Sequence, residues 1–278
     1  MRPICFLTDF GSDDAYAGIC RAVMERIASG VTVIDLTHGI APQAVRAGAV
    51  ALHDAAPFLP KDAVVCAVVD PGVGSARRAI AVRGGDRRFY VGPDNGLLLL
   101  AAERVGPLFD AVELADPRYR LDPVSATFHG RDVFAPAAAH LSSGVPLSEL
   151  GPAIDPSLLE RIALPAPTIG PGALATEVLV TDRYGNAQLA CTPADLAAAG
   201  LANAQRVEVQ AASDAALDLP AAPEAVLART FADAPAGSLL LHEDSTGHLA
   251  LAVAGGSAAA LLGLADGVAV TLAAPRRR

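Results

Sequence analysis

An aspartate and an arginine form the first candidate site, in the stretch VVCAVVDPGVGSARR at residues 64–78. Its apolar, β-branched beginning is typical of a strand buried on both faces of a sheet. Pro71 and Gly72 end that strand directly after Asp70, and Arg77 follows within a tight loop that can fold back toward the carboxylate. Open α/β sheets place ligand chemistry at such strand ends. The alternative is that Asp70 only stabilises its own turn and Arg77 is a solvated loop charge.

Further polar loops follow expected strands or turns, namely Asp9–Asp14, Asp94–Asn95 and Thr127–Asp132. In a doubly wound sheet such loops can converge on one edge. Aspartate, arginine and histidine from separate loops form a candidate acid–base set, and His129 is its natural third member because an unperturbed histidine titrates near neutral pH. Each residue alone also fits a structural role, Asp9 as a helix cap for example. Taken jointly, the structural interpretations are less favoured.

Metal and phosphate chemistry are weaker interpretations of the same loops. Hard and imidazole ligands are available from Asp9, Asp13, Asp14, His38, Asp70 and His129, but no HxH, HExxH or DxD pair occurs among them. Gly72-Val73-Gly74 matches neither a P-loop nor a dinucleotide fingerprint. No serine lies in a GxSxG elbow, and no cysteine has an evident base beside it. A metal-dependent hydrolase acting on a phosphorylated nucleoside remains an alternative, which chelator would test.

Composition limits the class of protein. The 278 residues allow one large or two modest domains, and the hydrophobic content of 52% supports a real core. The net charge of −9 argues against a nucleic-acid partner. No apolar run is long enough to span a bilayer, and the N-terminus lacks the order of a signal peptide. The four cysteines have no paired metal spacing, which favours buried free thiols and a cytoplasmic location.

The first part of the chain alternates strand and helix patterns. Strands are expected at Ile4–Thr8, Val31–Leu36 and Val64–Asp70, and two helices between them make a parallel, doubly wound start the expected fold. The first helix should carry its apolar face on Tyr16, Cys20, Val23 and Ile27, with caps from Ser12, Asp13 and Asp14. The second should cover 42–56. A hairpin across Gly84-Gly85-Asp86 and helices at 97–105 and 134–142 follow.

The second part of the chain has a different sequence pattern. The segment LPAPTIGPG at 164–172 is rich in proline and glycine, so we expect an α/β catalytic domain at 1–165, a linker at 166–171 and a smaller domain at 172–278. Short strand candidates separated by turns make this second domain all-β, a barrel or a sandwich. They lie at 174–181, 206–209, 238–242, 248–253 and 268–272. Helical patterns are limited to 193–199 and 257–262.

Motifs in both parts resemble those of the S-adenosyl-L-methionine hydroxide adenosyltransferases, which are related to the halogenating (fluorinase and chlorinase) adenosyltransferases. The matching stretches run in order along nearly the whole chain. They are LTDFGSDDAYAG, VIDLTHGI, VVDPGVGSARR, GPDNGLL, TFHGRDVFAPAAAHL, TDRYGN, TFAD and DSTGHLALA. DPGVG followed by PDNG and FHGRD is highly specific. The resemblance implies hydrolysis of S-adenosyl-L-methionine to adenosine and L-methionine without a metal or redox cofactor.

The resemblance also implies roles for individual residues. The family's catalytic Asp-Arg-His set falls on Asp70, Arg77 and His129, and its ribose-binding acid falls on Asp9. Other substrate-binding positions fall on Asp14, Tyr16, Asn95, Phe128, Asp182, Asn186, Phe231, Ser245 and the Gly255-Gly256 backbone. Members form trimers whose sites lie between one subunit's N-terminal domain and a neighbour's C-terminal domain. A homotrimer is therefore expected.

The same comparison disfavours halide as the nucleophile. The halogenating relatives carry Tyr, Thr and Ser where this chain has Asp70, Val73 and Gly130, and Tyr where it has His129. A carboxylate repels an anion, and the missing hydroxyls remove its hydrogen-bond donors. Departures at Gln43-Ala44, Leu189-Ala190-Cys191 and Thr246 affect the expected methionine-side contacts more than the water chemistry. An adenosine- or S-adenosylmethionine-binding protein without turnover is the remaining alternative, although a binder would not need the Asp-Arg-His set.

Overall fold

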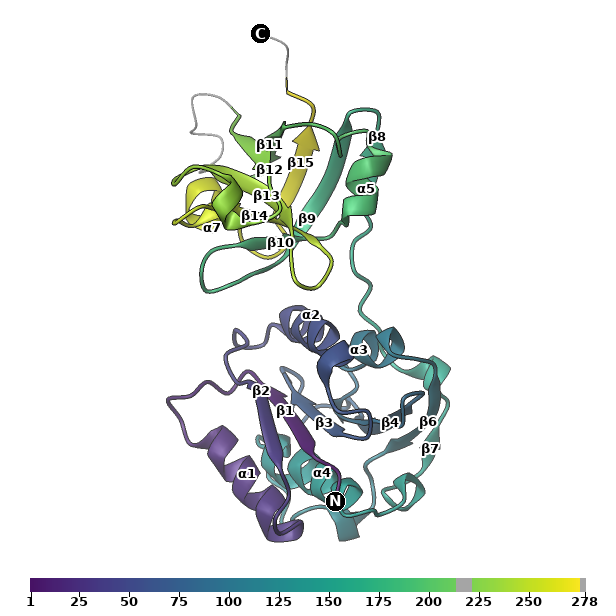
Figure 1. The fold of residues 1–278 in the computed structure, drawn as a ribbon. Helices are drawn as coiled ribbons and strands as arrows, with labels where there is room; N and C mark the ends of the chain where they lie inside the picture. The colour runs from purple at the N-terminus through teal and green to yellow at the C-terminus, as the bar shows by residue number, and fades with distance from the viewer. Residues whose placement is uncertain (214–221, 276–278) are drawn as a thin grey trace. The chain divides into compact units, whose positions relative to one another are not determined.

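The computed structural model describes residues 1–213 and 222–275. The chain divides into two compact units, one spanning Met1–Ile162 and the other beginning at Ala163. Within the Pro/Gly-rich segment 166–171, Thr168–Gly170 forms a short strand that pairs with the next one. Each unit has its own apolar core and is described by itself (Figure 1).

The first unit is built on a mixed sheet with the order β2-β1-β3-β5-β4-β6-β7. Strands β2, β1, β3 and β5 are parallel, whereas β4, β6 and β7 pair antiparallel. The predicted α/β domain with a largely parallel sheet is therefore confirmed, and β4 and β5 form the predicted hairpin. The strands are β1 (Ile4–Thr8), β2 (Val33–Thr37), β3 (Val64–Val68), β4 (Ala79–Gly84), β5 (Phe89–Pro93), β6 (Leu108–Glu113) and β7 (Ala153–Ile154).

Helices cover both faces of this sheet, which explains the continuous apolar runs of β1 and β3. Helices α1 (Tyr16–Ile27) and α4 (Ala135–Ser142) pack with Ile4 and Phe6 on one face. Helices α2 (Val45–Ala55) and α3 (Leu99–Arg104) share the other core with the alternate residues Cys5 and Leu7 (Figure 1). Both faces of the sheet are covered by apolar side chains, so polar side chains gather at the strand ends.

The starts of two helices differ from the sequence-based expectation. Helix α1 begins at Tyr16 without a side-chain cap, because the chain from Ser12 to Asp14 forms bends after Gly11, whose φ of +71° is left-handed. The predicted caps are therefore wrong. Helix α2 begins at Val45 rather than at residue 42, since Gln43 has a φ of +66° and its amide bonds elsewhere. Both departures lie in loops that carry candidate site residues.

The second unit is a closed barrel, which confirms the all-β prediction. The strand order β10-β14-β13-β12-β11-β15-β9 closes into a barrel through the pairing of β9 with β10. Strand β8 pairs antiparallel with the first residues of β9. Strands β8, β10 and β12 are too short or too polar for the sequence pattern to mark them. The strands are β8 (Thr168–Gly170), β9 (Ala173–Thr181), β10 (Ala187–Leu189), β11 (Arg206–Ala211), β12 (Glu224–Leu227), β13 (Leu239–Glu243), β14 (Leu249–Val253) and β15 (Ala269–Ala273).

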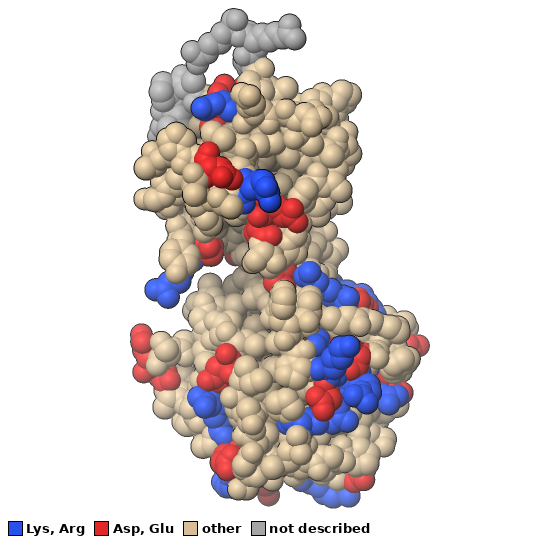
Figure 2. All heavy atoms as spheres, viewed as in Figure 1, with Lys and Arg blue, Asp and Glu red and all other residues tan. Residues whose placement is uncertain are grey.

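Two short helices lie among the described residues of the barrel unit, as predicted. Helix α5 (Pro193–Ala198) starts with a reciprocal capping box between Thr192 and Asp195, and α7 (Ala258–Leu262) follows β14. On the face drawn in Figure 2, acidic and basic side chains are interspersed over the first unit and sparse over the barrel. None of the described helices has the length and apolar character needed to cross a bilayer. All four cysteines are buried free thiols.

Candidate active site

The loop after β3 is shaped by its own hydrogen bonds. The Ser75 amide and hydroxyl both donate to the Gly72 carbonyl, and the Ser75 hydroxyl accepts from the Arg77 amide at 3.2 Å. Gly74 has a φ of +78°, and a Cβ there would lie 2.6 Å from the Ala126 carbonyl oxygen. Only glycine fits such a left-handed, crowded position. The turn therefore returns the chain so that Arg77 faces Asp70.

Asp70, Arg77 and His129 meet as the sequence predicts. Arg77 Nε donates to Asp70 Oδ1 at 2.8 Å, and Arg77 Nη2 donates to Asp70 Oδ2 in a forked pair. The same Nη2 lies 3.0 Å from His129 Nδ1. The Asp70 and Arg77 side chains are only 6% and 11% exposed. Arg77 thus joins a carboxylate from the end of β3 to an imidazole from a loop that is remote in sequence.

The electrostatics of this set favour a neutral histidine. Burial lowers the pKa of His129, and the adjacent Arg77 guanidinium lowers it further, whereas Asp70 opposes the shift. Arg77 also lies over the Phe134 ring, with its guanidinium carbon 5.2 Å from the ring centroid. The guanidinium is therefore fixed by a carboxylate, an imidazole and an aromatic face.

A π-helical turn places His129. This turn, η3 (Gly130–Phe134), starts directly after the histidine and runs into α4. A Cβ on Gly130 would lie 2.8 Å from Phe10 Cζ, so a side chain there would displace the neighbouring aromatic ring. Single π-turns occur often at functional sites. Glycine at residue 130 therefore permits this close aromatic packing.

The Asp9 loop lies after β1. Asp9 Oδ2 accepts a hydrogen bond of 2.8 Å from the Gln43 backbone amide. Because the donor is a backbone group, this bond does not depend on the type of side chain at residue 43. Phe10, Tyr16 and Phe128 form a cluster of rings, with centroids 5.7 Å apart for Phe10–Phe128 and 5.2 Å for Tyr16–Phe128. Tyr16 is 50% exposed. The structure thus brings a carboxylate and a partly open aromatic surface to one loop.

Two of the predicted substrate-binding residues, Asp14 and Asn95, do not contact the Asp9 carboxylate or the ring cluster through their side chains. Asp14 is exposed, and its side chain forms no hydrogen bond or ion pair with the described residues. Asn95 uses both ends of its amide on backbone groups, donating to the Val69 carbonyl at 2.9 Å and accepting from the Leu97 amide at 3.2 Å. Asn95 therefore ties the end of β3, next to Asp70, to the turn after β5.

In the barrel, the predicted residues Asp182 and Asn186 are partners in one turn between β9 and β10. Asp182 Oδ1 accepts from the Tyr184 and Asn186 amides at 2.8 and 2.9 Å, and Asn186 Nδ2 donates to Asp182 Oδ2 at 2.8 Å. Tyr184, at the tip of this turn, is 73% exposed. Tyr184 is not among the residues predicted from the sequence, although an exposed aromatic residue at a turn tip is a feature of binding surfaces.

The remaining predicted barrel positions are exposed. Phe231 is 50% exposed and packs its ring edge on His242 at a centroid distance of 5.0 Å. Ser245 and Gly255 are also exposed, and Gly255 has a φ of +75°. Ser245 lies in the turn between β13 and β14.

The turn that carries Ser245 is held by Asp244. Burial by itself raises the pKa of Asp244, but hydrogen bonds from Thr246, Gln188 and the His248 amide outweigh it and lower the pKa. Thr246 Oγ1 donates to Asp244 Oδ1 at 2.7 Å, and Gln188 Nε2 donates to Asp244 Oδ2 at 2.9 Å. Thr246 therefore stabilises the turn through its hydroxyl.

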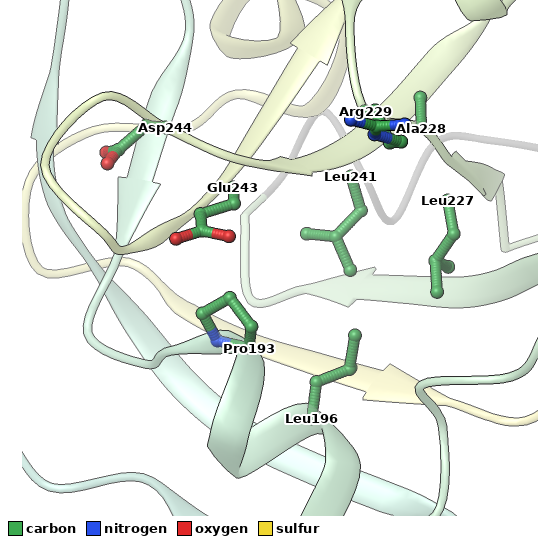
Figure 3. A pocket seen from close by; sticks show the side chains of 8 residues that line it. All are labelled: Pro193, Leu196, Leu227, Ala228, Arg229, Leu241, Glu243 and Asp244. Atoms are coloured by element: carbon green, nitrogen blue, oxygen red, sulfur yellow. The ribbon is translucent and has the colours of Figure 1, made fainter.

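A pocket of about 390 Å³ adjoins this turn within the barrel unit. Leu227 and Leu241 lie toward Pro193 and Leu196 across it, with Glu243 at one side (Figure 3). Asp244 belongs both to the pocket wall and to the turn. The pocket therefore borders the turn that carries Ser245, one of the expected substrate-binding positions.

The donor set gives no support for a metal. Among residues 1–213 and 222–275, no three or more His, Cys, Asp or Glu side chains gather as ligands. The Asp70 carboxylate is instead taken up by Arg77, a donor that cannot be deprotonated in proteins.

Comparisons with known proteins place both units in one family. The family model for the S-adenosyl-L-methionine hydroxide adenosyltransferase N-terminal domain matches residues 4–151, and that for the C-terminal domain matches residues 176–271. The chain is 48% identical to an (R)-S-adenosyl-L-methionine hydrolase of Salinispora tropica over 95% of both chains. It is 30% identical to a fluorinase of an Actinoplanes strain over 90% of both.

A solved structure of an uncharacterised conserved protein from Thermotoga maritima is similar over 98% of this chain and 100% of its own, with a TM-score of 0.88 and 32% identity. Sequence and fold thus agree across both units. The chain belongs to the S-adenosyl-L-methionine hydroxide adenosyltransferase family.

Proposed function

We propose that this protein hydrolyses S-adenosyl-L-methionine to adenosine and L-methionine. The observation that carries the proposal is the Asp70–Arg77–His129 set, in which one guanidinium joins a carboxylate to a neutral imidazole. The relative from Salinispora tropica bears the name of this hydrolase, which supports the substrate. No metal or redox cofactor is needed, because a sulfonium is already a good leaving group.

The direction of one hydrogen bond supports Asp70 as the proton acceptor. A guanidinium only donates, so His129 Nδ1 accepts from Arg77 and carries no proton. The neutral ring then bears its proton on Nε2 and can donate a hydrogen bond, but its basic nitrogen is occupied. Asp70 retains lone pairs beyond those that Arg77 uses. Asp70 is therefore the group that orients the water and takes its proton.

The chemistry is a single displacement. The oxygen of water bonds to C5′ of the ribose while the C5′–S bond breaks, and the bonding pair leaves with sulfur as the neutral thioether of methionine. One proton of the water passes to Asp70. Positive charge on the sulfonium is neutralised as the reaction proceeds, so a carboxylate fixed in place before the reaction favours the transition state electrostatically.

Asp9 and the aromatic rings bind the nucleoside in this proposal. The Asp9 carboxylate would accept hydrogen bonds from both ribose hydroxyls. The hydrogen bond from the Gln43 amide to Asp9 Oδ2 fixes the orientation of this carboxylate. The half-open ring cluster of Tyr16 and Phe128 offers a surface for the nucleoside. Asp14 and Asn95 then act at the rim and through backbone positioning. Binding remote from C5′ serves to align the reacting atoms.

Halide is excluded by the same geometry. Asp70 places negative charge beside the position of the nucleophile, while Val73 and Gly130 supply no hydroxyl to a halide ion. Water, which donates to a carboxylate, fits instead. The proposed partner is thus a small molecule, and the buried free thiols are compatible with a reducing cytoplasm.

Turnover of the pure protein tests the function. We expect adenosine and methionine in equal amounts from S-adenosyl-L-methionine, with chelator present and halide absent. Asp70→Asn should abolish most of this activity, by about 10²-fold or more. Asp110→Asn is the matched control, because Asp110 pairs with Arg83 on the surface of the same sheet. No adenosine, or product only with added metal or halide, would refute the proposal.

We further propose a homotrimer in which the barrel residues Asn186, Phe231 and Ser245 complete a neighbour's site. The exposure of Phe231 and Ser245 supports this role, because each is open to a partner. Light scattering measures the mass. At S-adenosyl-L-methionine concentrations well below KM, mixing inactive Asp70→Asn chains with Phe231→Ala chains should give more activity than the two variants give separately, since some sites then receive two intact halves. The absence of this gain in mixed trimers would contradict shared sites.

A further inference from the structure

We propose that Thr8 and His38 are positioning residues for Asp9, acting through a buried relay of hydrogen bonds that nucleoside binding requires. This inference rests on the proposed function, because it assigns Asp9 to the ribose. It adds two residues that the sequence analysis left outside the substrate site.

The contacts surround Asp9 on both sides in sequence. Thr8, the last residue of β1, is fully buried, and its hydroxyl accepts from the Phe10 amide at 3.2 Å. Thr8 Oγ1 also lies 2.9 Å from His38 Nδ1. The Gly11 amide donates to the His38 carbonyl at 2.8 Å. His38, just after β2, thus holds the Asp9 loop through both its side chain and its backbone.

The direction of the relay follows from its end groups. His38 Nε2 lies 3.3 Å from Asp35 Oδ1, so a proton on Nε2 faces a carboxylate and Nδ1 is left as an acceptor. The Thr8 hydroxyl then donates to Nδ1 and accepts from the Phe10 amide. Arg21 of α1 donates to Asp35 Oδ2 at 2.9 Å and fixes the far end. The Thr8 hydroxyl therefore acts as both acceptor and donor, whereas the contact of His38 Nε2 with Asp35 is electrostatic and lacks hydrogen-bond geometry.

Burial makes the relay hard to replace. The Thr8 side chain is out of reach of solvent, and His38 packs its ring edge against Phe6 at a centroid distance of 4.9 Å. Removing the hydroxyl would leave the Phe10 amide and the His38 nitrogen without their partner, and water cannot substitute. The backbone on either side of Asp9 would then lose its fixed course, while the Asp70 set would stay intact.

The matched pair Thr8→Val and Thr8→Ser tests the relay, because valine keeps the shape and serine keeps the hydroxyl. We expect Thr8→Val to raise both the KM for S-adenosyl-L-methionine and the Kd for adenosine about tenfold, with kcat changed far less. Thr8→Ser should restore both constants toward wild type. His38→Ala should reproduce the valine effect.

Thr37→Val is the control, because the Thr37 hydroxyl also accepts an amide two residues ahead, from Gly39, but outside the relay. Equal constants in Thr8→Val and wild type, or an equal effect of Thr37→Val, would overturn the inference. Adenosine binding, measured by calorimetry, separates the two proposals. If the wild type binds adenosine without hydrolysing S-adenosyl-L-methionine, the function fails, yet the Kd series still decides the role of Thr8. If it does not bind adenosine, both fail.

Discussion

The strand-end site of the first unit and the turns of the barrel use polar residues in opposite ways. At the strand ends, Asp70 and Arg77 are buried and hydrogen-bonded across long sequence distances, so their geometry is fixed before any ligand arrives. In the barrel, Asp182 and Asn186 bond only within their own turn, and Phe231 stays exposed. The contrast supports our proposal that the first unit supplies the chemistry and the barrel supplies recognition.

This contrast explains why similar motif residues call for different tests. A buried charge pair that loses one member leaves the other unpaired in a place that water reaches poorly. An exposed side chain that is removed leaves only a smaller contact area. Changes at Asp70 and Arg77 should therefore act on kcat, and changes in the barrel on KM or on folding.

The largest effect is expected from Arg77→Lys. An ammonium cannot form the forked bond to Asp70 and reach His129 at the same time, so the carboxylate loses its fixed orientation. We expect kcat to fall about 10²-fold with little change in the Kd for adenosine, compared by stopped assays and calorimetry. Arg83→Lys, in an exposed pair with Asp110, is the control. A loss of adenosine binding equal to the loss of kcat would remove the distinction between chemistry and recognition.

Asp182→Ala should act mainly on folding. Its carboxylate accepts from two backbone amides and the Asn186 amide, and alanine would leave the turn without these bonds. We expect the unfolding free energy to fall by about 1 kcal/mol, measured by denaturant titration. Asp13→Ala, in an exposed bend, should have no such effect. An unchanged stability together with a raised KM would make Asp182 a ligand group instead.

Phe231→Ala should give a smaller, purely kinetic effect. The ring is half exposed and contacts His242 only at its edge, so the barrel loses little packing. We expect the KM for S-adenosyl-L-methionine to rise several-fold, on the order of 1 kcal/mol in binding, with kcat nearly unchanged. Phe109→Ala, exposed on β6, is a matched control. A pure kcat effect at Phe231 would contradict recognition by the barrel.

The pH profile should show the mildest signature of the strand-end set. Burial and Arg77 lower the pKa of His129, so the imidazole stays neutral at pH values where an ordinary histidine is already protonated. The acid limb of kcat/KM should therefore lie below the usual value of about 6.5, and activity should fall only as the pH drops through the lowered pKa. Arg77→Gln should move this limb upward. A limb at or above 6.5 in the wild type would argue against the neutral ring.

Much of this arrangement could be predicted from local sequence. The apolar runs of β1 and β3 require two covered faces, and the Pro71-Gly72 stop after Asp70 places that carboxylate at a strand end. The short strand β10 could not be predicted, because three residues carry too little pattern. Its place depends on pairing with β9 and β14, which are distant in sequence.

The residues of the candidate site could be predicted from the sequence, but the groups that they hydrogen-bond could not. The motifs selected Asp9, but its bond to the Gln43 amide depends on a left-handed residue that ends the expected helix early. Asn95 was selected as a ligand group, whereas its amide bonds to backbone on both sides. Such contacts depend on tertiary placement, which residue types alone do not specify.

Hydrolysis in oxygen-18-enriched water tests the central claim, attack of water on C5′, most directly. The account predicts that mass spectrometry will find one labelled oxygen in the adenosine and none in the methionine. Asp110→Asn should give the same pattern at the same rate. Unlabelled adenosine, or label in a homoserine product formed by cleavage on the other side of sulfur, would contradict it.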